Sequence, residues 1–124
     1  MRIGAIIFSR FSSQRLPGKA LIDINGRELL GRVIDRSKFI KNIDEIIVAT
    51  SSEIEDDTIA EYVKKENIQI FRGSLNNVAE RALNASIFFQ LDSFVRICGD
   101  RPYFDPDLVT ELVAIQRNLD KDLI

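Results

Sequence analysis

The chain has 124 residues, 45% of them apolar, which suits one domain with a sizeable core. Its 17 lysines and arginines nearly balance 19 aspartates and glutamates, for a net charge of -2, so it lacks the overall basic footprint of a nucleic-acid-binding protein. With no histidine and a single cysteine, Cys98, the composition excludes a zinc site, a histidine-based triad and an internal disulfide.

The apolar residues show neither the pattern of a membrane span nor that of a secretion signal. The apolar runs are far shorter than the roughly 20 residues that a membrane-spanning helix needs. The chain opens directly with RIGAIIF, without the apolar region and cleavage site of a signal peptide. Together with the single cysteine, which suits a reducing compartment, this pattern predicts a cytoplasmic protein that does not associate with membranes.

The first predicted strand is the continuous apolar run IGAIIF, residues 3–8, of the kind that a parallel sheet buries on both faces. A polar loop follows, and Asn25-Gly26 marks a turn. The next segment predicts a helix, because its apolar residues recur at helical spacing: Leu29, Leu30, Val33 and Ile34.

Residues 45–50 (EIIVAT) form the second predicted strand. Ser52 and Glu55 then fit the capping-box pattern that opens a helix. Asp56 and Asp57 could form an acidic pair for a metal ion, but in the first turn of a helix we expect them to complement the helix dipole.

The middle of the chain predicts a third strand and a third helix. Asn67 is expected to end the preceding helix, and residues 68–71 (IQIF) form a short strand. The helix that follows ends near Phe89, and both Phe88 and Phe89 are expected in the core. Further apolar residues of this helix recur at helical spacing: Val78, Ala79, Ala82 and Leu83.

The fourth predicted strand comprises residues 94–98 (FVRIC) and ends on Cys98, which we expect to be a small buried hydrophobe. Asp105 is a good N-cap, and Pro106 suits the first position of the last helix. The expected apolar face of that helix consists of Leu108, Leu112, Val113 and Ile115.

This alternation of strands and helices predicts an α/β fold, with a mostly parallel sheet between helical layers in the Rossmann-like manner. Ligands of such sheets lie beyond the carboxyl ends of the strands. Two polar clusters follow strands there: the loop of residues 9–19, and Gly99-Asp100. The final DKDLI resembles the start of another strand, so we expect residues 1–124 to be part of a longer domain.

The loop of residues 9–19 lacks the known glycine-rich phosphate motifs. Gly18-Lys19 matches the end of a P-loop, but Ser13 stands at the required upstream glycine and Ala20 lacks the hydroxyl that contacts magnesium. G-x-G-x-x-G is also absent, which argues against a dinucleotide.

The same loop carries three cationic side chains, Arg10, Arg15 and Lys19. At the carboxyl end of a strand they could neutralise the phosphates of a nucleotide through charge-assisted hydrogen bonds. Ser9 and Ser13 could add further donors. The spacing alone equally fits a solvated, arginine-rich loop.

The stretch SRFSSQRLPGKAL…ING…LL…RVI resembles the N-terminal signature of the sugar-acid cytidylyltransferases. This family comprises the acylneuraminate and 3-deoxy-manno-octulosonate cytidylyltransferases and the spore-coat polysaccharide biosynthesis protein F group. The match to R-x-x-S-x-R-L-P-G-K is unbroken from Arg10 to Lys19. The later blocks IDEIIVATSS, FRGS…V…R and VRICGDRPYFDP resemble the spore-coat protein F group most closely, and the likeness runs from Met1 to about Val113.

The resemblance implies the fold of nucleotide-diphospho-sugar transferases and the transfer of CMP from CTP to a sugar acid, with Mg2+ as cofactor and release of pyrophosphate, for surface polysaccharide or glycan biosynthesis. Arg10, Arg15 and Lys19 would contact the CTP phosphates, with Arg10 and Lys19 as catalytic residues, and Asp100 would hold Mg2+. Two further arginines are expected to contact the nucleotide: Arg72 and Arg81.

Two departures from the family bear on the acceptor. Cys98 stands where the octulosonate enzymes typically carry glutamine, which disfavours octulosonate and leaves that base contact open. The chain is also shorter than family members, whose second half supplies acceptor contacts, a further acidic metal ligand and much of the dimer interface. We therefore expect this chain to bind CTP but turn over poorly, and the full-length protein to be a homodimer.

Other interpretations remain open. Asp100 alone would fit a cap of the turn after a strand, and Arg96 could either pair locally or face the nucleotide. The protein could be a non-catalytic nucleotide-binding or interaction module. It could also be a nucleotide-sugar-dependent glycosyltransferase, although the Asp-x-Asp motif of those enzymes is absent near Asp100.

Overall fold

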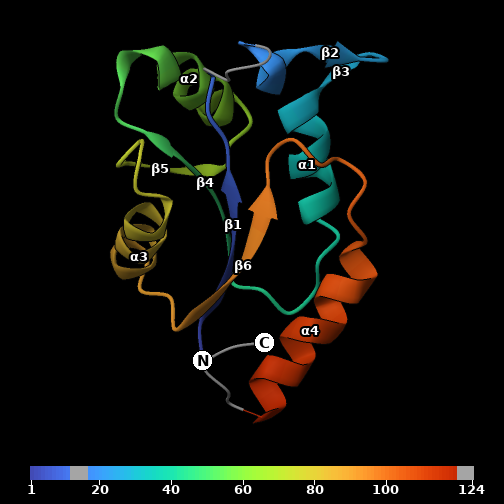
Figure 1. Cartoon of the computed structure of the whole chain (residues 1–124). Coiled ribbons are helices and arrows are strands. Elements are labelled where there is room, and N and C mark those ends of the chain that lie inside the picture. Colours follow the sequence, from blue (N-terminus) through green and yellow to red (C-terminus); the bar gives the residue numbers. More distant parts are fainter. Residues whose placement is uncertain (12–16, 120–124) are drawn as a thin grey trace.

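The computed structural model describes residues 1–11 and 17–119, and its centre is a parallel sheet with helices on both faces (Figure 1). Four strands form this sheet in the order β5-β4-β1-β6: β1 (Ile3–Phe8), β4 (Glu45–Ser51), β5 (Gln69–Gly73) and β6 (Ser93–Cys98). Every pair is parallel. The predicted α/β class and all four predicted strands are confirmed. The run IGAIIF lies between two neighbours, which explains its apolar character on both faces.

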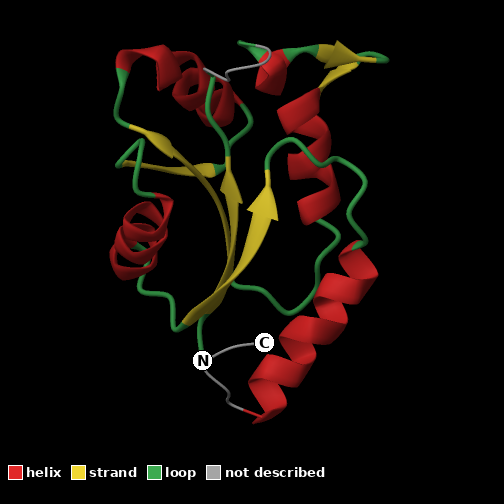
Figure 2. Ribbon diagram, viewed as in Figure 1, coloured by secondary structure: helices red, strands yellow, loops and turns green. Residues whose placement is uncertain are grey.

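Helices cover the two faces of the sheet unequally (Figure 2). Helices α1 (Leu29–Ser37), α2 (Asp57–Lys65) and α4 (Pro106–Leu119) contribute to the larger core cluster, and α3 (Val78–Phe88) contributes to the smaller one. The larger cluster contains Leu30, Val33, Ile59 and Val63, all fully buried. We call this side the closed face, and the α3 side the open face.

The open face has a thin core. Its cluster consists of Ile6, Ile47, Ala49 and Ala85, with partly buried aromatics packed against it. Val95 and Ile97 of β6 pack into the closed-face cluster, so the alternate residues Phe94, Arg96 and Cys98 point to the open face. Phe94 and Arg96 are exposed there.

A small hairpin follows the first loop. Strands β2 (Asp23–Ile24) and β3 (Arg27–Glu28) pair antiparallel around the predicted turn, where Asn25 and Gly26 have φ angles of 53° and 94°. Two consecutive positive φ angles are typical of a type I′ hairpin turn, which favours Asn-Gly. The turn is confirmed, and the structure adds the two short strands.

The capping-box prediction at Ser52 and Glu55 is wrong. A 3-10 turn, Ile54–Asp56, precedes α2, which begins at Asp57. The Ser52 hydroxyl donates to the carbonyl of Gly73, 3.3 Å away, so it holds the end of β5 and does not cap a helix. The predicted cap of α4 is confirmed, since Asp105 accepts from the amide of Asp107 at 2.9 Å.

Several predicted core residues lie on the surface. Phe88 is 69% exposed and Leu83 is 59% exposed, because α3 buries only its narrow inner side against the sheet. Phe89 is partly buried, as expected. On α4, Val113 is buried, but Leu108, Leu112 and Ile115 are exposed. No described element covers the outer side of α4, so its apolar spacing did not predict burial. Among the described residues, no helix has the length and apolar character needed to cross a membrane.

Candidate functional site

A cavity of about 420 Å³ opens at the carboxyl ends of the strands, a size typical of small-molecule sites. Its walls come from the end of β1 with the first loop, from the segment before α3, and from the end of β6. β1 and β6 are neighbours in parallel register, with Phe8 opposite Cys98. The residues that follow these two strands therefore emerge side by side.

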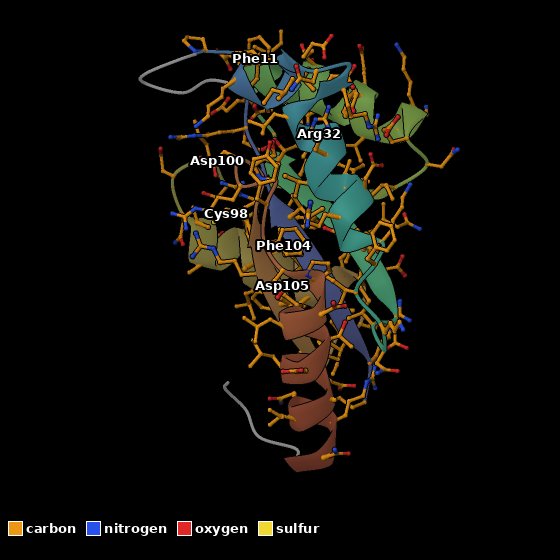
Figure 3. The ribbon with its side chains drawn as sticks, turned by 90° about the vertical axis from the view of Figure 1, so that its right-hand side faces the viewer. Phe11, Arg32, Cys98, Asp100, Phe104 and Asp105 are labelled. Atoms are coloured by element: carbon orange, nitrogen blue, oxygen red, sulfur yellow. The ribbon has the colours of Figure 1, made fainter. Side chains whose placement is uncertain are left out.

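The two polar clusters predicted from the sequence meet in this cavity. Arg10, Lys19 and Asp100 all line it, and Lys19 Nζ lies 3.4 Å from Asp100 Oδ2. Figure 3 shows Asp100 between Cys98 and Phe11 at this end of the sheet. Both partners of the ion pair are half-exposed, so the pair is accessible to a ligand.

Two glycines shape the cavity mouth. The amide of Gly18 donates to the carbonyl of Phe11 at 2.8 Å, which draws the two ends of the first loop together, and its φ of 78° is unfavourable for other residues. A Cβ on Gly99 would lie 2.7 Å from the carbonyl oxygen of Phe8, so glycine is needed for this close approach. Ser9 lines the cavity, whereas Ser13 and Arg15 lie outside the described residues.

Asp56 anchors the start of the first loop, a role that the sequence analysis missed. Its carboxylate is fully buried and accepts from the amide of Phe11 at 2.5 Å and from the amide of Ser51 at 3.3 Å. It also accepts from the Ser51 hydroxyl. Asp56 stands at the N-cap position of α2, as expected near the start of a helix, but its side chain makes no cap hydrogen bond and turns inward to the loop and β4. Asp57 does lie in the first turn of α2.

The two predicted nucleotide-contacting arginines differ in position. Arg81 is only 3% exposed and lines the cavity, where it donates to the carbonyls of Ser74, Ala49 and Leu75 at 2.9, 3.2 and 3.3 Å. Burial lowers the pKa of its guanidinium below the usual range, although the nearby Asp56 carboxylate opposes this shift. Arg81 thus fixes the wall before α3.

Arg72 lies apart from the predicted site residues that line the cavity. It is absent from the cavity lining within the described chain. Its guanidinium donates to the carbonyls of Ser51 and Glu53 at 2.9 Å each and pairs with Asp57 at 2.8 Å. These contacts join β5 to the start of α2.

Arg96 and Cys98 of β6 also line the cavity. Cys98 is half-buried, so the expectation of a buried core cysteine is corrected. The exposed Arg96 places its guanidinium carbon 5.3 Å from the centre of the Phe8 ring. The question left open for Arg96 is thereby answered: its side chain faces the cavity. Strand alternation with Cys98 was the sequence signal for this position.

Asp100 is an accessible carboxylate at the cavity that could bind a metal ion. Within residues 1–11 and 17–119, no group of three or more metal-binding side chains gathers. Magnesium is commonly held by one or two carboxylates together with phosphate oxygens and water. A single accessible carboxylate beside cationic residues therefore fits a magnesium ion that arrives with a nucleotide.

Comparison with known proteins gives one family and a consistent set of relatives. A family model described as cytidylyltransferase matches residues 4–122. An uncharacterized protein of Methanocaldococcus jannaschii is 38% identical over 97% of this chain and 50% of its own length. The spore coat polysaccharide biosynthesis protein SpsF of Bacillus subtilis is 32% identical, over 94% of this chain and 49% of its own length. A 3-deoxy-manno-octulosonate cytidylyltransferase of Geobacter sulfurreducens is also 32% identical, with 92% and 45% covered.

Two solved structures agree with this family assignment. A cytidylyltransferase from Leptospira borgpetersenii superposes with a TM-score of 0.87 at 35% identity, over 93% of this chain and 48% of that one. A CMP:2-keto-3-deoxy-manno-octonic acid synthetase complexed with CTP gives a TM-score of 0.84 at 25% identity, with 95% and 48% covered. The chain spans about half the length of the relatives it matches.

Proposed function

Since this chain belongs to the cytidylyltransferase family, we propose that it binds CTP in the cavity at the carboxyl ends of its strands. The proposed reaction of the protein is transfer of CMP to a hydroxyl of a sugar acid, with release of pyrophosphate. The observation that carries the proposal is the meeting of Lys19 with Asp100 at 3.4 Å across the cavity. It joins a cationic loop and an acidic group, the two components that a metal-bound triphosphate requires.

The chemistry of nucleotidyl transfer explains why cations gather here. The acceptor oxygen must approach an α-phosphate that is already negatively charged, so catalysis consists mostly of positioning and charge neutralisation. Arg10 and Lys19 would hold the β- and γ-phosphates and stabilise the pyrophosphate as it leaves. Arg15 belongs to the same motif and would add a third contact.

Asp100 would hold magnesium, which when bound supplies a Lewis acid for the phosphate oxygens. An ion pair as exposed as Lys19–Asp100 contributes little stability, so breaking it costs little. Lys19 can then turn to a phosphate oxygen, and the Asp100 carboxylate becomes available as a ligand.

The two other arginines would act less directly. Arg81 donates to three backbone carbonyls, so we assign it to positioning the wall before α3, beside the nucleotide. Arg72 is tied to Asp57 and to β4, and its contribution would be to hold the elements behind the first loop.

The relatives support a sugar acid as the acceptor class. One is described as a 3-deoxy-manno-octulosonate cytidylyltransferase and another as a spore coat polysaccharide biosynthesis protein. We therefore extend the proposal to a role in the synthesis of surface polysaccharide or related glycans.

Calorimetric titration with CTP, with and without Mg2+, tests the binding site. Lys19→Ala should weaken CTP binding roughly 10- to 100-fold, since it removes a hydrogen bond to a charged group. Lys41→Ala is the matched control, because Lys41 is an exposed lysine outside the cavity lining, and it should leave the affinity unchanged. Equal effects of the two variants would contradict the proposed site.

Pyrophosphate release tests the reaction. The natural full-length protein should release pyrophosphate from CTP and Mg2+ only when a sugar acid is present, and Lys19→Ala should slow that release. Binding of CTP without release for any sugar acid would instead support a non-catalytic nucleotide-binding module.

A further inference from the structure

The residues that line the cavity fall into two chemically distinct groups. Arg10, Lys19 and Asp100 follow the ends of β1 and β6 and are the groups assigned above to the triphosphate and its metal; we call their part of the cavity the outer end. We call the part lined by residues of β1, β6, α3 and the segment before α3 the inner compartment: Phe8, Leu75, Val78, Arg81 and Arg96. This inner compartment combines apolar side chains with two guanidinium groups, and none of its five residues is acidic.

We propose that Arg96 reads the edge of the nucleobase and makes the inner compartment selective for cytosine over uracil. This inference rests on the proposed function, since it assumes that the triphosphate occupies the outer end. It assigns a specificity-determining role to a residue of β6 that lies outside the phosphate-binding motif.

The position of Arg96 suits this role. It precedes Cys98 by two residues on the same side of β6, so its Cα lies roughly 7 Å below the end of the strand. In register it is opposite Ile6 of β1. Its side chain therefore reaches the cavity from within β6, whereas Asp100 lies in the segment after that strand.

The inner compartment offers surfaces for a flat ring. Leu75 and Val78 are half-buried apolar residues at the cavity wall, and a half-buried Phe8 ring lies beneath the arginines. The guanidinium of Arg96 lies over that ring at 5.3 Å. Contact with an aromatic face restrains a guanidinium while leaving its edge N–H groups able to donate.

The two inner arginines differ in how many of their five N–H donors are already used. Arg81 is buried and donates to three backbone carbonyls. The guanidinium of Arg96 makes no hydrogen bond or ion pair with any residue that the structure describes. A ligand in the inner compartment would therefore find most of the free donors on Arg96.

Hydrogen-bond chemistry then selects the base. A guanidinium offers donors only, in a planar fork. The pairing edge of cytosine presents two adjacent acceptors, O2 and N3, which match such a fork. Uracil carries a hydrogen on N3, so one donor of Arg96 would face another donor, and the unmade hydrogen bond would cost affinity.

A carboxylate is the other common partner of a guanidinium, and the acceptor is proposed to carry one. The surroundings favour the base, because a flat ring can use the apolar contacts of Leu75 and Val78 whereas a carboxylate cannot. Binding of the acceptor by Arg96 is one of the outcomes that the experiment below separates.

The experiment compares the dissociation constants of CTP and UTP, measured with Mg2+ on the wild-type chain, Arg96→Ala and Arg96→Lys. The wild type should prefer CTP roughly 10-fold or more, within the range for a good bidentate base contact. Arg96→Ala should bring the UTP-to-CTP ratio close to one, mainly by weakening CTP. Arg96→Lys keeps the charge but loses the fork, so it should also lose most of the preference.

Arg101→Ala is the matched control, because Arg101 is an exposed arginine close to Asp100 in sequence and outside the cavity lining; its ratio should stay at the wild-type value. Equal weakening of CTP and UTP by Arg96→Ala would show that only charge matters and would overturn the assignment. Unchanged affinity for both nucleotides would overturn it in favour of another ligand, and an acceptor titration would then identify a carboxylate. A wild-type chain that binds neither nucleotide would defeat the proposed function, and the assignment with it.

Discussion

The closed and open faces of the sheet have different roles in this molecule. On the closed face, helices α1, α2 and α4 contribute to a core whose central side chains are fully buried. On the open face, α3 covers a small cluster and leaves Phe94 and Arg96 of β6 exposed. The cavity lies at the carboxyl ends of the strands and continues onto this second side. The comparison indicates that the closed face holds the framework, while the open face keeps surface available for ligands.

Truncation of one leucine on each face tests this division most strongly. Leu30 of α1 is fully buried in the closed-face core, whereas Leu83 of α3 is 59% exposed. Leu30→Ala should lower the free energy of unfolding by about 2–5 kcal/mol. Leu83→Ala should change it by no more than about 0.5 kcal/mol. Urea unfolding of both variants gives these values, and comparable losses at the two sites would contradict the division.

A smaller effect on the free energy of unfolding is expected from Asp56, which links the start of α2 to the first loop. Asp56→Asn keeps the shape of the side chain but replaces one acceptor oxygen by an NH2 group, which must face the amide of either Phe11 or Ser51. One buried amide then loses its partner, at a cost of about 1–3 kcal/mol. Because Phe11 follows Arg10, the variant should also weaken CTP binding.

The adjacent Asp57→Asn serves as the control for Asp56→Asn. Asp57 is half-exposed and pairs with Arg72 at 2.8 Å, so its loss should cost less than about 1 kcal/mol. Urea unfolding and CTP titration of the two variants separate the roles of this acidic pair. A loss from Asp56→Asn no larger than that from Asp57→Asn would contradict the anchoring role of Asp56.

The sequence was sufficient to predict the strands and the approximate site, for physical reasons. Continuous apolar runs identified the buried strands, and parallel strands bring the residues after them to one edge. Arg10, Lys19 and Asp100 could therefore be expected together from the sequence alone. The Asn25-Gly26 turn could also be predicted from the local sequence, because it depends on two adjacent residues that tolerate positive φ.

The remainder depends on contacts that local patterns do not encode. Asp56 bonds Phe11, 45 residues away in the chain, and its sequence context resembled an ordinary first helical turn. Apolar spacing on α4 grouped Leu108, Leu112 and Ile115 on a common side, but it could not tell whether another element covers them. Likewise, Arg96 was known to share a side with Cys98, yet only the packing of α3 shows that this side opens to the cavity.

The smallest expected effect concerns the polar network at the rim of the closed face. Arg27 pairs with Asp35 at 3.0 Å and donates to Tyr62 at 3.1 Å, and it also pairs with Glu66. The hydrogen bond from Arg27 holds the pKa of Asp35 below its usual value. A carboxyl with a lowered folded-state pKa stabilises the fold above its unfolded pKa of roughly 4, and this contribution is lost as pH falls through the folded-state pKa.

Arg27→Gln should therefore reduce, but not abolish, the decrease in the free energy of unfolding at acid pH. Asp44 should keep its lowered pKa in the variant, because that pKa is lowered mainly by a hydrogen bond from the amide of Ile3 and next by one from Arg117. Urea unfolding between about pH 5 and pH 2 should show a smaller acid-induced loss for Arg27→Gln than for the wild type. Since Asp35 is half-exposed, solvent screening limits the difference to less than about 1 kcal/mol. Parallel curves would mean that the Arg27 network contributes nothing to the pH dependence of the free energy of unfolding.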